Sequence, residues 1–426
     1  MRPMLLLAIV AACGGSGGGP SGDDGGGDDV DAGVIDDPIP DDAIYLDPAT
    51  GSATAPGTAE APWPGLADSI AAGLLATVPD GKTLVLRDGN HGNAVFEGNH
   101  ASAVIIRAAP GATPKLGRLE VRKGSGWHLR GLTISPSFSA APYTNVIVSL
   151  GESGTSTDLV LEQSSVFDTA DTTAWTAAQW MGAHSAILMG RNGTNLTVRT
   201  THVYNVRFGI SITSFDSTVE GNLVANFSGD GIRVTRDGDK VIDNVIKNVF
   251  VSASDGDDNH DDAIQCFLFN VGTGTVRNVT LRGNVVVNRE NAAQPLTNQL
   301  QGIGFFDGPL INFVVEDNVV FVDHYHGVSL YDAQGSRIVN NLTYTRWGGA
   351  AHPWVMLGQK LGMASGNVMH DNVAHSFDFA ADATVDAANN TVVTTAVAEQ
   401  RLAAQVTAIE AKWGVTMRDG AHRLAP

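Results

Sequence analysis

The chain has 426 residues, of which 43% are hydrophobic and 17% charged, so it can bury a large core. Its formal net charge is −19, and this excess of acidic residues argues against nucleic acid as a partner. There are two cysteines, Cys13 and Cys266, which are too few for a framework of disulfide bonds.

The first 13 residues have the features of an export signal. Arg2 precedes an apolar run at residues 4–12 that is too short to span a bilayer, and Cys13 follows this run. Residues 10–13, Val-Ala-Ala-Cys, resemble the lipobox of bacterial lipoproteins. The resemblance implies that Cys13 is lipidated and becomes the mature N-terminus. Because Gly14 and not aspartate follows, we expect an anchor in the outer membrane or at the cell surface. A cleaved signal peptide is the alternative, and it also leads to export.

Residues 14–42 are dominated by Gly, Ser, Pro and Asp, with nine aspartates and no Lys or Arg. Such a composition cannot bury enough apolar surface to fold, so we expect a flexible, self-repelling tether. An acidic calcium-binding loop is an alternative, but the aspartates lack regular spacing. With these aspartates and Arg2 set aside, residues 43–426 still carry a net charge of −11. A polyanionic ligand of the folded part therefore needs local basic residues or a bridging cation.

Residues 43–82 are expected to form a first strand and a helix that caps the N-terminal end of the fold. Apolar residues recur at helical spacing within residues 66–77, and Pro-Asp-Gly at 79–81 ends the helix. Short apolar runs separated by turn residues then follow at 83–87, 94–97, 104–107, 116–121 and 127–134. Strands this short indicate an all-β solenoid and not a sandwich, and the helix would cover its open end.

From about residue 145 a repeat becomes explicit. Each copy has a small residue, a branched apolar residue, a variable residue and a second apolar residue. The first branched positions, which we call the marker positions, are Ile187, Ile210, Ile232, Ile264, Ile303 and Val328. They are separated by 23, 22, 32, 39 and 25 residues.

A second register in the repeat places asparagine before apolar residues, at Asn222, Asn244, Asn284, Asn318 and Asn341. Asparagine tolerates the left-handed backbone of a tight turn, and stacked amides can hydrogen-bond from coil to coil. We therefore expect a structural ladder at one corner of the solenoid.

The Gly-Ile-x-Ile and x-x-Asn-x-Val repeats resemble those of the right-handed parallel β-helix superfamily. That superfamily includes pectate lyases, polygalacturonases, mannuronan C5-epimerases and the family of chondroitinase B and alginate lyases. The resemblance implies an all-β fold, a single-stranded right-handed parallel β-helix at residues 83–395, with loops inserted at 249–258 and 287–301. It specifies the fold and leaves the activity open.

Residues 396–426 are expected to form a C-terminal capping helix and a tail. Within 397–413, four apolar residues fall on one side of a helix: Leu402, Val406, Ile409 and Trp413. We expect the whole chain to be a monomer.

Strand side chains alternate, so the marker residues and those two places later point into the core. Cys266 falls in this inward column and is expected to be structural. Two places before the markers stand Asp230, Asp262, Gln301 and His326. Coils about 4.8 Å apart would bring these four side chains into one file.

Further polar residues are expected beside this file. Arg233 and Gln265 would flank it, His260 and Asp261 would enter from the preceding loop, and Arg207 and His184 from earlier coils. Two stacked carboxylates repel one another, so they need a cation, a shared proton or an arginine. The alternative is that Asp230 and Asp262 are ordinary turn residues with Arg233 as a salt-bridge partner.

The first candidate function is a polysaccharide lyase or epimerase, which removes the C5 proton of a uronic acid residue. This chemistry needs a base and a group that neutralises the substrate carboxylate. We predict as catalytic residues His260, Asp262, Arg233 and His326, with a histidine as base and Arg233 or Arg207 on the carboxylate. The predicted substrate-binding residues are Gln265, Gln301, Arg207, Tyr325 and Tyr331. Oxygen ligands from Asp230, Asp261 and Asp262 would hold Ca²⁺. The usual arginine and lysine motifs of the lyases, and the Asp-Pro-His motif of the epimerases, are absent.

Two other functions stay open. The motifs Asp230-Gly231, Asp261-Asp262, His326-Gly327 and Arg337-Ile338 resemble those of polygalacturonases, which implies a hydrolase with an acid and base drawn from the aspartates. The chain departs from that pattern, since it lacks Asn-Thr before Asp230 and has Val339 where a lysine belongs. A non-catalytic glycan-binding protein or adhesin would instead use Tyr325, Tyr331, Trp347 and Trp354 as stacking faces for sugars. In all three cases the partner is a polysaccharide.

Overall fold

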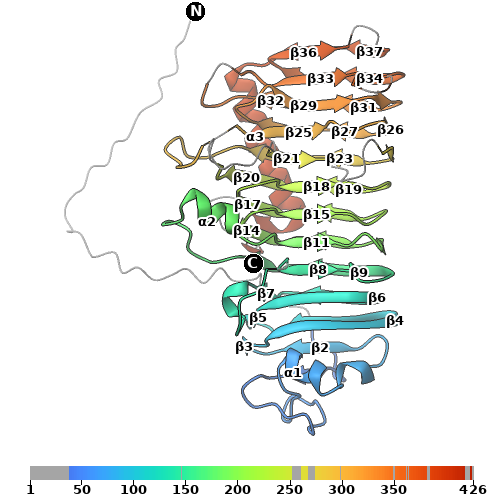
Figure 1. Ribbon diagram of the computed structural model, residues 1–426, viewed down its shortest axis with the longest axis vertical. Helices are drawn as coiled ribbons and strands as arrows, with labels where there is room; N and C mark the ends of the chain where they lie inside the picture. Colours follow the sequence, from blue (N-terminus) through green and yellow to red (C-terminus); the bar gives the residue numbers. More distant parts are fainter. Residues whose placement is uncertain are drawn as a thin grey trace, which may run out of the picture.

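The computed structural model describes residues 38–144, 146–251, 261–266, 274–297, 299–348, 351–360, 362, 364–380, 384–417 and 423–424. Over these residues the chain winds into successive coils, and each strand pairs in parallel with its counterpart one coil later (Figure 1). The predicted fold, a right-handed parallel β-helix, is confirmed. Cys13, the export signal and most of the predicted tether lie outside the described residues. No helix in the described part of the chain is both long and apolar enough to cross a membrane.

Two long sheets of 23 and 12 strands form the walls of the coil over the described residues. In the larger sheet the first coils are β1 (Ile44–Leu46), β2 (Thr83–Leu86), β4 (Asn93–Ala108) and β6 (Arg118–Arg130). Its later strands form two rows. The first row, which carries the candidate site, is β8 (Val148–Leu150), β11 (Ile187–Met189), β15 (Ile210–Ile212), β18 (Ile232–Val234), β21 (Asp262–Gln265), β25 (Gln301–Phe305), β29 (His326–Tyr331), β33 (Trp354–Gly358) and β36 (Ser376–Phe379). The second row is β9 (Ser156–Glu162), β12 (Gly193–Thr194), β13 (Thr197–Arg199), β16 (Thr218–Glu220), β19 (Lys240–Ile242), β23 (Thr280–Arg282), β27 (Val314–Glu316), β31 (Arg337–Val339), β34 (Asn367–His370) and β37 (Val385–Ala388).

The smaller wall consists of β3 (Gly89–Asn90), β5 (Pro114–Leu116), β7 (Thr133–Ile134), β10 (Ser165–Phe167), β14 (His202–Val206), β17 (Leu223–Phe227), β20 (Val245–Val249), β24 (Val285–Val287), β28 (Val319–Phe321), β32 (Leu342–Tyr344), β35 (Val373–Ala374) and β38 (Thr391–Val392). A short third sheet joins β22 (Val276–Arg277), β26 (Leu310–Ile311) and β30 (Ala333–Gln334). An antiparallel pair, β39 (Val415–Thr416) and β40 (Arg423–Leu424), follows the last helix.

The first coils differ from the prediction of short separate strands. Residues 94–97 and 104–107 belong to one strand, β4, which stays paired with β6 along most of its length. The register shifts between Phe96 and Gly98 and again between Asn99 and Val104. These irregularities absorb the turn residues, so the chain bends without leaving the sheet.

The interior follows the predicted alternation. Ile232, Val234, Ile264 and Cys266 are all buried, and burial raises the pKa of the Cys266 thiol. Cys266 is therefore a core residue, as predicted.

The predicted asparagine ladder is also present. In each step the side-chain oxygen of one asparagine accepts from the amide group of the asparagine one coil before, at 2.8–3.0 Å. The column runs through Asn222, Asn244, Asn284, Asn318, Asn341, Asn372 and Asn390.

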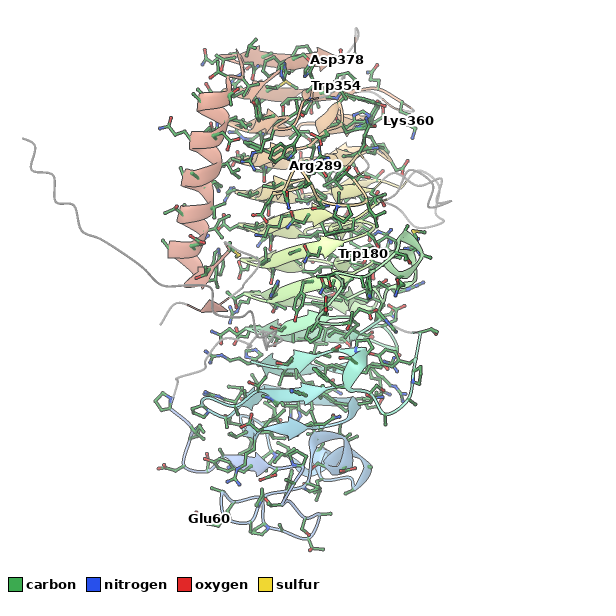
Figure 2. All side chains as sticks on the ribbon, turned by 90° about the vertical axis from the view of Figure 1, so that its left-hand side faces the viewer. Glu60, Trp180, Arg289, Trp354, Lys360 and Asp378 are labelled. Atoms are coloured by element: carbon green, nitrogen blue, oxygen red, sulfur yellow. The ribbon has the colours of Figure 1, made fainter. Side chains whose placement is uncertain are left out.

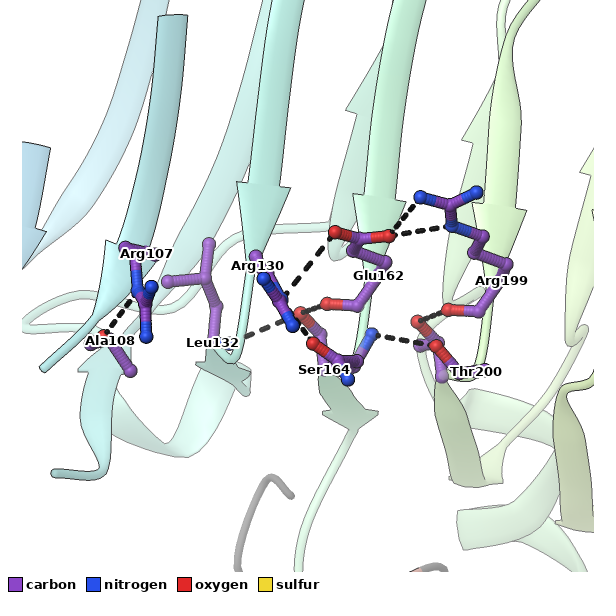
Figure 3. A network of polar contacts seen from close by, with 10 residues as sticks. Arg107, Ala108, Arg130, Leu132, Glu162, Ser164, Arg199 and Thr200 are labelled. Carbon is purple, nitrogen blue, oxygen red and sulfur yellow. Dashed lines mark hydrogen bonds and ion pairs between the residues drawn. The ribbon is translucent and has the colours of Figure 1, made fainter. Parts of the chain in front are cut away.

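A second ladder, made of charged residues, lines the outer face of the early coils (Figure 3). Glu162 lies between two arginines, with one carboxylate oxygen 3.5 Å from Nε of Arg130 and the other 2.6 Å from Nε of Arg199. The three residues occupy the same register on successive strands. Alternating charge stabilises such cross-strand neighbours, so we assign this network to the scaffold.

The helices lie on the outside of the coil. At the N-terminal end, α1 (Leu66–Ala71) and the 3-10 turn η1 (Leu75–Thr77) replace the single predicted helix, because Gly73 adopts a φ of +74° between them. Leu66 and Leu75 join the core there, as expected for a cap. Two short elements that were not predicted, η2 (Pro136–Phe138) and α2 (Ala177–Gly182), interrupt the loops after β7 and β10.

The long helix α3 (Thr395–Trp413) was predicted to cap the C-terminal end of the β-helix, but it does not cover that end. It runs back along the flank of the smaller wall and contacts β24, β28 and β32 (Figures 1 and 2). Its apolar side, with Leu402, Val406 and Ile409, packs against outward-facing side chains such as Val285 and Val319. The physical reason is that this wall is apolar on both faces and needs a cover.

Candidate functional site

The predicted file of polar residues stands where β18, β21 and β25 begin. Asp262 pairs with Gln301 on the next coil, and its backbone N–H donates to Oδ1 of Asp230 at 3.0 Å. Further along the strands, Arg233 pairs with Gln265. Residues that are far apart in the sequence therefore meet because the parallel register places each above its counterpart.

Arg233 is held between a carboxylate and an aromatic ring. Its Nε donates to Oδ2 of Asp230, and its guanidinium carbon lies 3.8 Å from the centre of the Phe208 ring. A cation over an aromatic face is attracted to it, so Phe208 helps to orient the guanidinium. Arg207 contacts the same ring at 5.1 Å and donates to the carbonyl oxygen of Met181 in α2 at 3.0 Å. The Arg233 side chain is 19% exposed, so a ligand can reach this cation.

The two aspartates of the file form an unequal pair. Asp230 and Asp262 are each 1% exposed. Burial, reinforced by the nearby carboxyls of Asp230 and Asp261, raises the pKa of Asp262 well above its usual range. Burial also raises the pKa of Asp230, but the Arg233 guanidinium opposes this effect. When the pair is singly ionised the charge therefore belongs on Asp230 beside Arg233, and Asp262 carries the proton.

Two polar atoms of the site have no hydrogen-bond partner among the described residues. They are Oδ1 of Asp262 and Oε1 of Gln301. Buried polar atoms normally find partners, because leaving one unsatisfied costs about 1–3 kcal/mol. Two such atoms on neighbouring coils favour a site that receives polar groups from a ligand.

His326 is engaged with two neighbours on its own and the next coil. Nε1–H of Trp354 donates to Nδ1 of His326 at 3.3 Å and to Oγ of Ser329 at 3.1 Å, and that Oγ lies 2.8 Å from Nδ1. The single indole N–H lies closer to Oγ of Ser329 than to Nδ1 of His326, and the contact between that Oγ and Nδ1 fits either tautomer of the ring. The role of His326 as a base stays a prediction.

Aromatic rings surround His326 over three coils. Tyr325 lies 4.4 Å from it and 4.9 Å from Trp354, while Phe306 lies 4.9 Å from it and 5.6 Å from Tyr331, all measured between ring centres. Tyr325 is 43% exposed. In Figure 2 Trp354 lies near the C-terminal end of the stack, several coils above Trp180 of α2. We call Tyr325, Tyr331 and Trp354 the aromatic platform.

Beyond the other end of the file lies a histidine, His184, whose ring is fixed by two contacts. Nδ1 of His184 lies 2.7 Å from Oδ2 of Asp168, and Nε2 lies 2.7 Å from the carbonyl oxygen of Tyr143. The hydrogen bond to Asp168 raises the pKa of His184. Because both ring nitrogens face oxygen acceptors, the protonated ring fits these contacts. His184 was predicted from its place in the repeat, whereas Asp168, in the loop after β10, has no distinctive spacing from it and was not predicted.

The predicted calcium site is not assembled in the described structure. Over the described residues, no group of three or more His, Cys, Asp and Glu side chains is placed to hold a metal ion. Both carboxylate oxygens of Asp230 already have partners, since Oδ2 accepts from Nε of Arg233 and Oδ1 accepts from the backbone N–H of Asp262. In the arrangement described here, the three predicted ligands do not form a site for Ca²⁺. His260, the other predicted base, lies outside the described residues.

Comparisons with known proteins found similarity in fold only. No family model and no curated protein matches the chain. Among solved structures, the pectate lyase Pel9A matches at 12% identity and a TM-score of 0.42, over 84% of this chain and 79% of that chain. The alginate lyase from Paenibacillus sp. str. FPU-7 matches at 13% identity and 0.44, over 82% and 99%. The GH136 lacto-N-biosidase from Eubacterium ramulus matches at 12% and 0.48, over 82% and 67%. At such identities and TM-scores no activity is inferred from these matches.

Proposed function

We propose that this protein binds a polysaccharide that carries carboxylate groups, along the outer face of β18, β21, β25, β29 and β33, and acts on it as a lyase. The observation that carries the proposal is the setting of Arg233, which is partly exposed, rests on Phe208 and contacts one of two unequal carboxyls. A guanidinium is well suited to pair with a carboxylate, and an unequal carboxyl pair suits acid and base roles.

In the proposed reaction the substrate carboxylate takes the place of Asp230 on Arg233. Pairing with the Arg233 guanidinium neutralises the negative charge of the substrate carboxylate, and the hydrogen on the neighbouring C5 becomes more acidic as a result. Asp230, freed as an anion, removes that hydrogen as a proton, and His260 is the alternative base. The electrons of the C5–H bond form the C4–C5 double bond while the C4–O bond breaks, and Asp262 donates its proton to the leaving glycosidic oxygen.

The aromatic platform supports binding of a chain and not of a single sugar. Rings at Tyr325, Tyr331 and Trp354 offer apolar faces to the C–H faces of sugars, and the two tyrosines also carry hydroxyl groups. The platform and Arg233 lie on different coils, about 4.8 Å apart for each coil of separation. A ligand that reaches both must extend along the stack.

The test is incubation with a panel of uronic-acid polysaccharides, read by the ultraviolet absorbance of unsaturated chain ends. We expect Arg233→Met to reduce kcat/KM at least about 100-fold, because it removes the group that neutralises the substrate carboxylate. The matched control is Arg236→Met, since Arg236 also lies over a phenylalanine ring, Phe215, but outside the site. No absorbance with any polysaccharide would refute the lyase, and new reducing ends without absorbance would indicate hydrolysis.

A non-catalytic glycan-binding function is the second candidate, favoured by one observation. Asp230 and Asp262 are almost fully buried, whereas Arg233 and Tyr325 are accessible, so the accessible groups alone can hold a glycan. Binding without any product, weakened by Arg233→Met, would support this function.

Export as a lipoprotein anchored through Cys13, and a monomeric state, remain part of the proposal. Labelling of the full chain with a radioactive fatty acid, lost in Cys13→Ser, tests the anchor.

A further inference from the structure

The outer face of β25 has a notch at Gly304 that two side chains share. A Cβ at this position would lie 2.6 Å from Oδ1 of Asp262 and 2.5 and 2.7 Å from two carbons of the Phe306 ring. Side chains essentially never approach a Cβ so closely. Glycine at 304 is therefore what allows the ring edge and the carboxyl oxygen to occupy the space above one Cα.

The Phe306 ring is held in this place by its neighbours. It lies against His326 at 4.9 Å and against Tyr331 at 5.6 Å between ring centres. The ring itself is partly exposed, while Asp262 beneath it is 1% exposed. A partly exposed apolar ring and a buried carboxyl oxygen therefore share the Gly304 notch.

The carboxyl oxygen under the ring has no compensating polar contact. Oδ1 of Asp262 finds no hydrogen-bond partner within the described part of the chain, although it is buried. An ionised carboxylate in such a place is strongly disfavoured, whereas a neutral carboxyl is tolerated.

We propose that Phe306 is a positioning residue, whose ring in the Gly304 notch keeps water from Oδ1 of Asp262 so that this carboxyl enters the reaction as an acid. The catalytic meaning of this inference rests on the proposed lyase function, while the protonation of Asp262 can be tested without any substrate. Burial is the largest cause of the raised pKa of Asp262, so removing the ring should have a measurable effect.

Infrared difference spectra between the wild type and Asp262→Asn provide the test. They should show a carbonyl band of a protonated carboxyl at neutral pH. In Phe306→Ala we expect the midpoint at which this band disappears to fall by at least about one pH unit, a tenfold change in proton affinity. Phe306→Leu, which restores an apolar cover, should recover most of the shift. Phe215→Ala, which removes a phenylalanine outside the site, should leave the midpoint unchanged.

An unchanged midpoint in Phe306→Ala would overturn the proposal, and so would absence of the band in the wild type. If Phe306→Ala fails to fold, Phe306→Gln brings a polar amide to Oδ1 in a side chain of similar length, and the same fall is expected.

With an active substrate, the limb of the pH–rate profile that reports the acid should move to lower pH in Phe306→Ala and return in Phe306→Leu. The two proposals fail separately. If the band shifts in Phe306→Ala but no polysaccharide gives a product, the shielding of Asp262 by Phe306 is supported and the lyase function is refuted. If a polysaccharide is cleaved by elimination but the band does not shift, the lyase function is supported and the shielding by Phe306 is refuted.

Discussion

Removing the side chain of Asn284 should be among the most destabilising single changes in the scaffold. Asn284 is fully buried, and its Oδ1 accepts from the backbone N–H of Asn244 at 3.1 Å and from Nδ2 of Asn244 at 3.0 Å. Its Nδ2 donates to the carbonyl oxygen of Val241 and to Oδ1 of Asn318, both at 2.9 Å. Alanine would leave two buried donors of Asn244 without an acceptor. At about 1–3 kcal/mol for each donor, the free energy of unfolding should fall by about 4 kcal/mol.

Equilibrium unfolding in urea, followed by circular dichroism, measures this loss. Two variants serve as comparisons. Asn390→Ala removes the last member of the same ladder, where partial exposure lets water replace the lost contacts, so about 1–2 kcal/mol is expected. Asn93→Ala removes an exposed asparagine that bonds Ser139, and less than about 0.5 kcal/mol is expected. A loss in Asn284→Ala no larger than that in Asn390→Ala would refute the idea that burial gives the ladder its strength.

Three further outcomes follow from the same contacts. Since the pKa of Asp262 in the folded state lies above the unfolded value, the free energy of unfolding should fall as the pH rises between these two values. In Asp262→Asn the urea midpoint should not show this fall and should be higher than that of the wild type at neutral pH. The same variant should lose activity. Since the pKa of His184 is raised in the folded state, its contribution to stability should be complete below the pKa of the unfolded state and should be lost as the pH rises through the pKa of the folded state. In Asp168→Asn this pH-dependent loss of stability should disappear. In Gly302→Ala the new Cβ would lie 2.1 Å from the carbonyl oxygen of Gly327 on the next coil, so we expect a loss of at least about 3 kcal/mol in the free energy of unfolding.

The fold was predictable because its determinants repeat. Ile232 and Ile264 occupy one inward column, and Asn244 and Asn284 one corner, so each coil confirms the pattern of the others. The strand register that stacks Asp262 on Gln301 follows from the same repeat.

The position of α3 was missed although the sequence contains a signal for it. Runs such as Val285–Val287 are apolar at every position, and a strand buried on both faces has this appearance. The helix pattern alone shows that one side of α3 is buried, but not against which surface.

The details of the site depend on contacts that no spacing reveals. Phe306 directly follows β25, and continued alternation along the chain would point this apolar residue outward, which is a usable signal in the sequence. That its ring covers Asp262 depends on the missing side chain of Gly304 one coil above the acid. The contacts of Trp354 with His326 and Ser329 likewise depend on rotamers, which no spacing in the sequence predicts.

Stacking of like residues on successive coils stabilises the asparagine ladder but destabilises the stacked aspartates Asp230 and Asp262. This contrast is the strongest argument that the two aspartates are present for a function and not for the scaffold. A coil repeat places like above like, and an amide has both a donor and an acceptor, so asparagines satisfy one another along their column. A carboxylate has only acceptors, so Asp230 and Asp262 need a proton, the Arg233 guanidinium and a backbone N–H. Asparagine at 262 would serve the scaffold better than aspartate. If Asp262→Asn becomes more stable and loses activity, the acid belongs to the function; if it becomes more stable and keeps activity, the chemistry lies elsewhere.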